Sequence, residues 1–300
     1  MTVFTRRSTL GLIAASGGVA ACAVVADAKE GDTAATGSGH FLLDVPLLET
    51  GSPLRVWYHR PVSTGPDSQV VMVMHGQGRN ADGYRDGWIP HAEALGLVIV
   101  APEFDRGAFP GAREFNLGWM FDADGTPRAR DRWSFSIVDL AFDAAAARFG
   151  SRRTTYGLFG HSAGGQFVHR FMLFMPTTRV ERAISANSGW YTLPTLEQPF
   201  PYGAGGTTVT EADIAAYLGE PLVLLLGEAD IDPAHSALNT DAEVMPQGPH
   251  RFARGQTFFA AGRREAERLG VPFGWTLQTV PGVAHSGSRM AGPAARLLKG

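Results

Sequence analysis

Three short, uninterrupted apolar runs mark the middle of the chain, at residues 70–74, 97–101 and 222–226. Each run is short and is bounded by Gly or Pro, which favours a strand over a segment of buried helix. Strands that are apolar on both faces are typical of the middle of a parallel sheet covered by helices. An alternating run at 54–58 predicts a half-exposed strand near a sheet edge, and residues 275–280 predict the last strand.

Apolar positions at helical spacing fill the intervals between these strands. In residues 137–149, the apolar side chains that fall on one side are Val138, Ala141, Phe142, Ala145 and Phe149. Further helices are predicted at 88–95, 166–175, 210–218, 255–269 and 287–298. Strands that alternate with helices predict an α/β fold, with a doubly wound, mostly parallel sheet and helices on both faces. Active sites in such sheets gather at the carboxyl ends of the strands.

The alternation continues without an internal repeat, so we expect a single domain over residues 46–300. The segment before it, residues 29–45, begins with polar and Gly-rich sequence and predicts a flexible linker. Two segments within the domain, 105–133 and 187–208, follow neither the strand nor the helix period. Loops of this length in a compact domain usually form lids or walls of a site, and their aromatic residues can equally pack the loops onto the body.

The first 28 residues predict an export signal. Arg6 and Arg7 precede an apolar run of small residues, and no acidic residue occurs before Asp27. Residues 5–10 resemble the twin-arginine signal of bacteria, although Thr9 stands where that signal usually has Phe. Two processing sites are compatible with the sequence. Residues 26–28 have the small-x-small form of a signal-peptidase site, and residues 19–22 resemble a lipobox in which Cys22 would be lipidated. We therefore expect a periplasmic or extracellular protein, with a membrane-anchored lipoprotein as the other possibility.

The composition restricts which catalytic groups the body of the protein can use. The chain has 300 residues, a net charge of −3 and 44% hydrophobic residues, which describes an ordinary globular protein with no sign of a nucleic-acid partner. Lysine occurs only at Lys29 and Lys299, which excludes a phosphate-loop lysine, a Schiff base and a Ser-Lys dyad from the body of the protein. Cys22 is the only cysteine, so the body has no disulfide, thiol nucleophile or zinc-thiolate site.

One motif organises the rest of the sequence. The apolar run that begins at Tyr156 leads into Gly-His-Ser-Ala-Gly at 160–164, and a helix pattern follows at once. This arrangement resembles the nucleophile elbow of α/β-hydrolases, a sharp turn that lifts the Ser162 oxygen above the sheet. A side chain two positions before or after the serine would collide with neighbouring backbone, which explains the glycines. Alone, the motif also fits a simple turn.

A nucleophilic serine needs a base, and the base needs an acid that fixes its tautomer. In the α/β-hydrolase arrangement the acid and then the histidine follow the serine in the sequence. Of the nine histidines, His285 is the one that follows the last predicted strand. The acid should come from the loop after 222–226. We assign Asp230, while Asp232 could reach the same point.

The developing oxyanion needs two N–H donors. We assign the first to the backbone of Ala163, the residue after the nucleophile, and the second to Gln77 in the loop His-Gly-Gln-Gly at 75–78. The small residues of this loop allow its backbone to approach a substrate closely. The loop also fits a plain Gly-rich turn after a buried strand.

Together, His-Gly-x-Gly at 75–78, Gly-His-Ser-Ala-Gly-Gly at 160–165, Gly-x-x-Asp at 227–230 and Pro-Gly-x-x-His at 281–285 resemble the α/β-hydrolase superfamily. The resemblance spans roughly residues 50–298. It extends to exported esterases related to polyhydroxybutyrate depolymerases, feruloyl esterases and dienelactone hydrolases. It implies cleavage of a small or polymeric carboxylic ester through an acyl-enzyme, with no metal or organic cofactor. Small exported depolymerases and feruloyl esterases of this kind usually carry cysteines, whereas the body of this protein after the export signal has none.

The loops offer candidates for substrate contact and leave alternatives open. Trp119, Trp190 and Tyr191 are candidates for the lining of an acyl or aromatic pocket. The arginines of 105–133 fit either an anionic acyl group or a solvated surface. A serine peptidase or amidase on the same fold, and a binding module without activity, are the alternative functions. A dinucleotide site is excluded, because the glycine after Gly78 is Gly83 and the required spacing fails.

Overall fold

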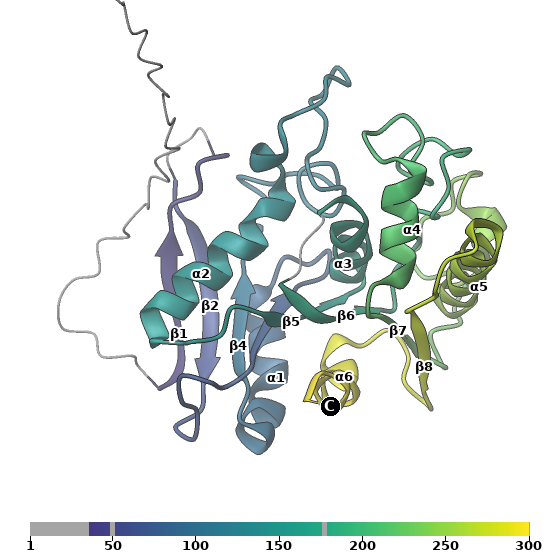
Figure 1. Ribbon diagram of the computed structural model, residues 1–300. Helices are drawn as coiled ribbons and strands as arrows, with labels where there is room; N and C mark the ends of the chain where they lie inside the picture. The colour runs from purple at the N-terminus through teal and green to yellow at the C-terminus, as the bar shows by residue number, and fades with distance from the viewer. Residues whose placement is uncertain (1–35, 49–51, 176–178, 300) are drawn as a thin grey trace, which may run out of the picture.

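The computed structural model describes residues 36–48, 52–175 and 179–299 (Figure 1). The predicted export signal, with the candidate lipidation site Cys22, lies outside the described residues. Within the described residues, no helix has both the length and the apolar character needed to cross a membrane.

A single eight-stranded sheet forms the centre of the molecule, in the order β1-β2-β4-β3-β5-β6-β7-β8 (Figure 1). The first two strands run antiparallel to their neighbours, and all later pairs are parallel. This confirms the predicted doubly wound, mostly parallel α/β fold. The strands are β1 Gly37–Leu43, β2 Leu54–Arg60, β3 Val70–Met74, β4 Val98–Pro102, β5 Tyr156–His161, β6 Val180–Ala186, β7 Leu222–Gly227 and β8 Thr276–Val280.

Helices cover both faces of the sheet. The α-helices are α1 Ala81–Leu95, α2 Ile137–Phe149, α3 Ala163–Phe174, α4 Glu211–Gly219, α5 Arg251–Leu269 and α6 Gly287–Lys299. Short 3-10 turns are η1 Arg130–Arg132, η2 Ser134–Ser136 and η3 Met245–Gln247. Helices α1 and α6 lie on one face, and α2 to α5 lie on the other (Figure 1).

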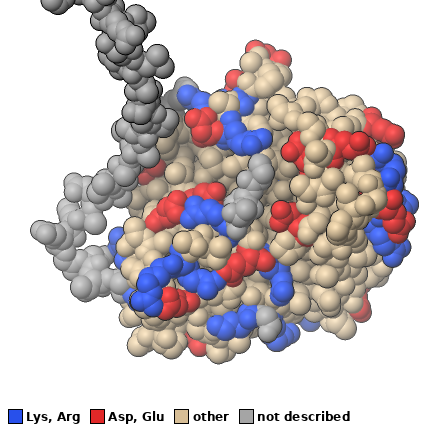
Figure 2. Space-filling view, viewed as in Figure 1, with Lys and Arg blue, Asp and Glu red and all other residues tan. Residues whose placement is uncertain are grey.

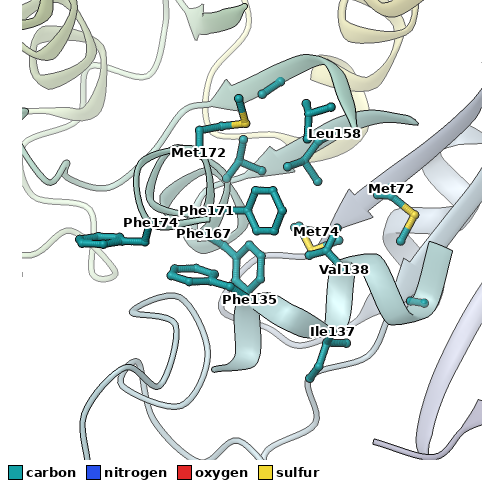
Figure 3. Packing of buried hydrophobic residues seen from close by; sticks show 14 of the residues in the cluster. Met72, Met74, Phe135, Ile137, Val138, Leu158, Phe167, Phe171, Met172 and Phe174 are labelled. Atoms are coloured by element: carbon teal, nitrogen blue, oxygen red, sulfur yellow. The ribbon is translucent and has the colours of Figure 1, made fainter. Parts of the chain in front are cut away.

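The alternation of side chains along β3 divides the core into two clusters. Val71 and Val73 pack under α1 and α6, whereas Met72 and Met74 pack under the opposite helices. Figure 3 shows the larger cluster, in which Met74 lies near phenylalanines of α3. The loop before α2 joins this cluster, because the Phe135 ring packs edge-on against Phe167 of α3, with 4.9 Å between ring centroids. Within the 105–133 insertion, the Phe115 ring also packs against Phe167, with 5.7 Å between centroids, so aromatic packing holds the insertion on the body.

Most predicted elements are confirmed, and β3 and α2 have the predicted bounds. The structure corrects the linker prediction for residues 37–43, which form the edge strand β1. An edge strand needs no continuous apolar run, because one of its faces stays exposed, and the exposed positions of β1 alternate. Strand β6 was not predicted, because Glu181 and Arg182 interrupt its apolar pattern at the half-buried end.

Charged side chains of both signs are intermixed on the face of the molecule seen in Figure 2. Several are paired. Arg179 pairs with Asp143 at 2.5 Å, and Arg268 pairs with Glu211 at 2.5 Å. Pairs as exposed as these contribute little to stability. The mixed pattern on this face agrees with the small net charge of −3.

Candidate active site

Ser162 occupies a strained turn between β5 and α3. Its backbone has φ 59° and ψ −118°, a conformation that residues with a side chain rarely adopt. A Cβ at Gly160 would overlap the carbonyl oxygen of Gly164, and a Cβ at Gly164 would overlap the carbonyl oxygen of Met74. The turn can therefore form only with glycine at these positions, as the sequence pattern indicated.

Two hydrogen bonds connect Ser162 to a histidine and a carboxylate. The Oγ of Ser162 lies 3.0 Å from Nε2 of His285, and Nδ1 of His285 lies 2.7 Å from Oδ2 of Asp230. The three residues come from the ends of β5, β7 and β8, which meet at one edge of the sheet. Asp232 is exposed, and its carboxylate accepts the N–H of Ala234 at 2.9 Å instead. The structure thus brings Asp230, rather than Asp232, to the histidine.

The carboxylate of Asp230 is 4% exposed and has further partners. Oδ2 accepts a hydrogen bond from the side-chain amide of Asn187 at 2.9 Å, and Oδ1 lies 3.4 Å from Nη1 of Arg251. The amide oxygen of Asn187 accepts the N–H of Gly227 at 2.8 Å, which fixes the amide in this orientation. Sequence reasoning missed both partners. Asn187 follows β6 at the same sheet edge, so recognition of that strand would have made it a candidate.

The loop that carries Gln77 lies against the nucleophile. A Cβ on Gly76 would lie 3.6 Å from the Cβ of Ser162. The carbonyl oxygen of Gln77 accepts a hydrogen bond from the exposed Arg106 at 2.8 Å. Among the hydrogen bonds formed by the described part of the chain, none uses the backbone N–H of Gln77 or of Ala163. Both N–H groups are therefore without a hydrogen-bond partner among the described residues, and their role as oxyanion donors stays a prediction.

His75 and Arg79 fix this loop. Nε2 of His75 accepts the N–H of Phe104 at 3.0 Å, so the ring donates from Nδ1 to the carbonyl of Gly76 at 2.9 Å. Burial lowers the pKa of His75 to about 4, which keeps the imidazole neutral. Arg79 donates to the carbonyls of Phe104 at 2.7 Å and Gly111 at 3.0 Å. These bonds connect the 105–133 insertion to the Gln77 loop.

His161 lies beneath the candidate base and does not replace it. Its ring centroid is 4.6 Å from that of His285, and its Nδ1 is 2.9 Å from the hydroxyl of Tyr84 in α1. Burial lowers the pKa of His161 well below its usual value, so this imidazole is neutral. Tyr84 also lies against Gly76 and Gly287, where an added Cβ would approach its hydroxyl. One tyrosine therefore packs against the Gln77 loop, the nucleophile turn and the start of α6.

The three aromatic candidates for substrate contact differ in exposure. Trp119 is half-buried and packs under Arg128, whose guanidinium carbon is 4.5 Å from the ring centroid. Trp190 is 8% exposed and packs under Arg170 at 4.2 Å. Tyr191 is fully buried and stacks on Phe258, with 4.4 Å between centroids. This burial contradicts direct contact of Tyr191 with a substrate. Within the described residues, no group of three or more His, Cys, Asp or Glu could hold a metal ion.

Solved structures similar to this chain include two hydrolases at 40% sequence identity or more. Poly(aspartic acid) hydrolase-1 of Sphingomonas sp. KT-1 is 42% identical, with a TM-score of 0.84, over 88% of this chain and 98% of its own. A poly(3-hydroxybutyrate) depolymerase of Bordetella parapertussis is 40% identical, with a TM-score of 0.82, over 88% of this chain and 90% of its own. An S-formylglutathione hydrolase of Agrobacterium tumefaciens shares the fold at 18% identity, with a TM-score of 0.57, over 87% and 93% of the two chains. The sequence matches no protein-family model, and the search of curated proteins gave no match.

Proposed function

The chain belongs to the α/β-hydrolase superfamily of serine-esterase-like proteins, and from this membership we propose that it is a serine hydrolase that cleaves carboxylic esters. Ser162 is the nucleophile, His285 the general base and Asp230 the acid that orients it. The observation that carries the proposal is the hydrogen-bonded series from Ser162 Oγ to His285 and on to Asp230, at 3.0 and 2.7 Å. Both distances lie within hydrogen-bonding reach, as proton transfer from the serine requires.

The reaction proceeds through an acyl-enzyme. Ser162 Oγ forms a bond to the acyl carbon while its proton passes to Nε2 of His285, and the carbonyl oxygen gains negative charge. The N–H groups of Gln77 and Ala163 stabilise this oxyanion. When the intermediate collapses, the bond to the alcohol breaks and the alcohol leaves with the proton from His285. Water then attacks the acyl carbon, gives its proton to His285, and releases the acid as Ser162 recovers that proton.

The environment of Asp230 supports its role. A buried carboxylate that accepts the Nδ1–H of His285 keeps Nε2 free to take the serine proton and stabilises the imidazolium that results. Asn187 donates to the same carboxylate oxygen, so the acceptor is held on the histidine side. Neutral His161, packed against the His285 ring, supports the plane of the base without competing for the proton.

A second candidate reaction is amide hydrolysis. The relative at 42% identity is a poly(aspartic acid) hydrolase and the relative at 40% is a polyester depolymerase, so the two comparisons favour different bonds almost equally. The same nucleophile, base and oxyanion donors serve both reactions, because each passes through a tetrahedral intermediate. Either a small or a polymeric substrate fits the proposal, and Trp119 and Trp190 are the proposed contacts. The leader before residue 29 supports export to the periplasm or the cell exterior, with or without a lipid on Cys22.

A fluorophosphonate probe tests the proposal directly. The probe should label the wild-type protein at Ser162, and Ser162→Ala should abolish labelling. Parallel assays with short-chain p-nitrophenyl esters and aminoacyl amides separate an esterase from an amidase. Failure of the folded wild-type protein to react with the probe would identify a non-catalytic module. Faster turnover of the amides would favour the second candidate.

A further inference from the structure

The first turn of α5 lies behind the carboxylate that faces His285. Arg251 is the first residue of this helix and is 1% exposed, and its Nη1 lies 3.4 Å from Oδ1 of Asp230. The next N–H of the helix, from Phe252, donates to the main-chain oxygen of Asp230 at 3.2 Å. The helix therefore contacts this aspartate twice, once through its backbone and once through a buried guanidinium.

The Arg251 guanidinium also contacts a second histidine, His235. Nη2 of Arg251 lies 3.3 Å from Nδ1 of His235, and this nitrogen also accepts the N–H of Ala237 at 3.1 Å. Both contacts are made by the same ring nitrogen of His235. Its ring centroid is 5.5 Å from that of His285. Arg251 thus lies between the carboxylate of Asp230 and the imidazole of His235, which packs beside the base.

We propose that Arg251 is a positioning residue that orients the carboxylate of Asp230 toward His285 and balances its charge. This inference rests on the proposed function of the pair. The two carboxylate oxygens are divided between partners. Oδ2 faces His285 and Asn187, and Oδ1 faces Arg251. This arrangement directs Oδ2 to His285, and the Arg251 guanidinium keeps the carboxylate from rotating Oδ1 toward the histidine.

The charges around Arg251 favour this role. Asp230 is the only carboxylate within 4.0 Å of the Arg251 guanidinium among the described residues. Burial lowers the pKa of Arg251, whereas the carboxylates of Asp230 and of the more distant Asp232 act to raise it. Burial and the charge of Arg251 also lower the pKa of Arg254. An arginine stays protonated in such a setting, so its full charge acts on the acid. Burial lowers the pKa of the neighbouring His161 well below its usual value, so this imidazole is neutral and does not balance the carboxylate.

Removal of the charge should change the pH dependence of the reaction. Without Arg251, no cation balances the negative charge of Asp230, so this charge favours the protonated form of His285 more strongly and the pair takes up its proton at a higher pH. In Arg251→Met, we expect the acid limb of kcat/KM for a p-nitrophenyl ester to move to higher pH by about one unit. We also expect kcat at the optimum to fall roughly 10- to 100-fold, because the acid is less well oriented. A residue with only a structural role would not move the acid limb.

Two variants make the test decisive. Arg254→Met is the matched control, because Arg254 is equally buried one turn later but donates to the carbonyls of Gly248 and Gly189 rather than to the acid. It should lose comparable stability with a clearly smaller shift of the acid limb. Arg251→Lys retains the charge and should restore most of the wild-type profile, and it serves also if Arg251→Met does not fold.

The outcomes distinguish this inference from the proposed function. If the wild-type protein reacts with a fluorophosphonate and Arg251→Met keeps the wild-type acid limb, the proposal for Arg251 is wrong while the serine hydrolase stands. An equal shift in Arg254→Met would likewise overturn it, because the effect would not depend on contact with Asp230. If Ser162 does not react in any variant, the proposed function itself fails.

Discussion

Ser162 is held in a backbone conformation that its side chain alone would not select. The φ of 59° places its hydroxyl within 3.0 Å of His285, and the surrounding glycines allow the turn to close. Alanine has a Cβ like serine and fits the same turn, so Ser162→Ala should remain folded. Its loss of the nucleophile should reduce turnover of a p-nitrophenyl ester by roughly 10⁴-fold or more. Circular dichroism checks the fold, and retention of more than a tenth of the activity would exclude Ser162 as the nucleophile.

The acid can be tested by a comparison of two neighbouring aspartates. Asp230 accepts from Nδ1 of His285, whereas Asp232 is exposed and accepts only the N–H of Ala234. Asp230→Asn should lower kcat by about 10²- to 10⁴-fold, less than Ser162→Ala, because an amide disturbs the tautomer of His285. Asp232→Asn should stay within about twofold of wild type, as is usual for an exposed turn residue. A larger loss in Asp232→Asn would reverse the assignment of the acid.

The sequence could predict those site residues that belong to a motif or follow a predicted strand. It could not predict those whose role depends on the direction in which the side chain points. Ser162 and His285 each follow a strand in the order that the superfamily uses, so position alone made them candidates. Arg251 begins a helix and contacts Asp230 through a pairing across 21 residues that no local pattern encodes. The sequence makes Tyr191 a candidate for the lining of an acyl or aromatic pocket, but it gives no sign of the direction in which a loop aromatic residue points.

At the scale of elements, the turn between β5 and α3 depends on close backbone contact with β3. A Cβ on Gly164 would overlap the carbonyl oxygen of Met74, which belongs to a buried central strand and cannot move aside. Gly164→Ala should therefore lower the free energy of unfolding by about 2 kcal/mol or more and impair activity. Urea unfolding measures the change.

Gly65→Ala is the control for this variant. A Cβ on Gly65 would meet no atom within 4 Å, so its effect on the free energy of unfolding should stay within about 1 kcal/mol. Equal stability of the two variants would show that the turn tolerates separation of α3 from β3, contrary to the overlap described above.

The elements that the sequence predicted best are those buried on both sides. Strands β3 and β7 are completely buried, and their continuous apolar runs could be recognised without any partner. Strand β1 lies at the edge of the sheet, its exposure alternates, and it begins with Gly-Ser-Gly, so its sequence resembles a linker. Helix α5 begins at Arg251, four residues before its predicted start, because buried arginines hide the apolar period of its first turn.

At the scale of the whole molecule, strand order brings the site together. Strand β5 lies between β3 and β6, so the Gln77 loop after β3 and Asn187 after β6 flank the serine from both sides. The next two strands, β7 and β8, deliver Asp230 and His285 to the same edge. Ser162 and His285 are 123 positions apart in the sequence, and the order of the strands brings their side chains within hydrogen-bonding distance. The two antiparallel strands at the other end of the sheet contribute nothing directly to this site.

The stability of the folded protein depends on pH through three buried histidines. His75, His161 and His169 are neutral in the folded protein, because burial lowers the pKa of each, to about 4 for His75. Nε2 of His169 accepts the N–H of Thr192 at 3.1 Å, a bond that protonation would break. In the unfolded chain these imidazoles have the ordinary pKa near 6.5 and take up protons as the pH falls. The stability that they contribute is thus complete above pH 6.5 and is lost on acidification toward pH 4.

Urea unfolding at pH 7.5, 6.5, 5.8 and 5.2 should therefore show a free energy of unfolding that falls progressively below pH 6.5. His75 alone accounts for a loss of about 3 kcal/mol by pH 4, and most carboxylates stay ionised above pH 5, so the histidines dominate in this range. His169→Gln keeps an acceptor for Thr192 and removes one titrating group, so its stability should depend less steeply on pH than that of the wild type. An unfolding free energy that stays constant from pH 7.5 to 5.2 would mean that these imidazoles take up protons without unfolding, and that their burial does not keep them neutral.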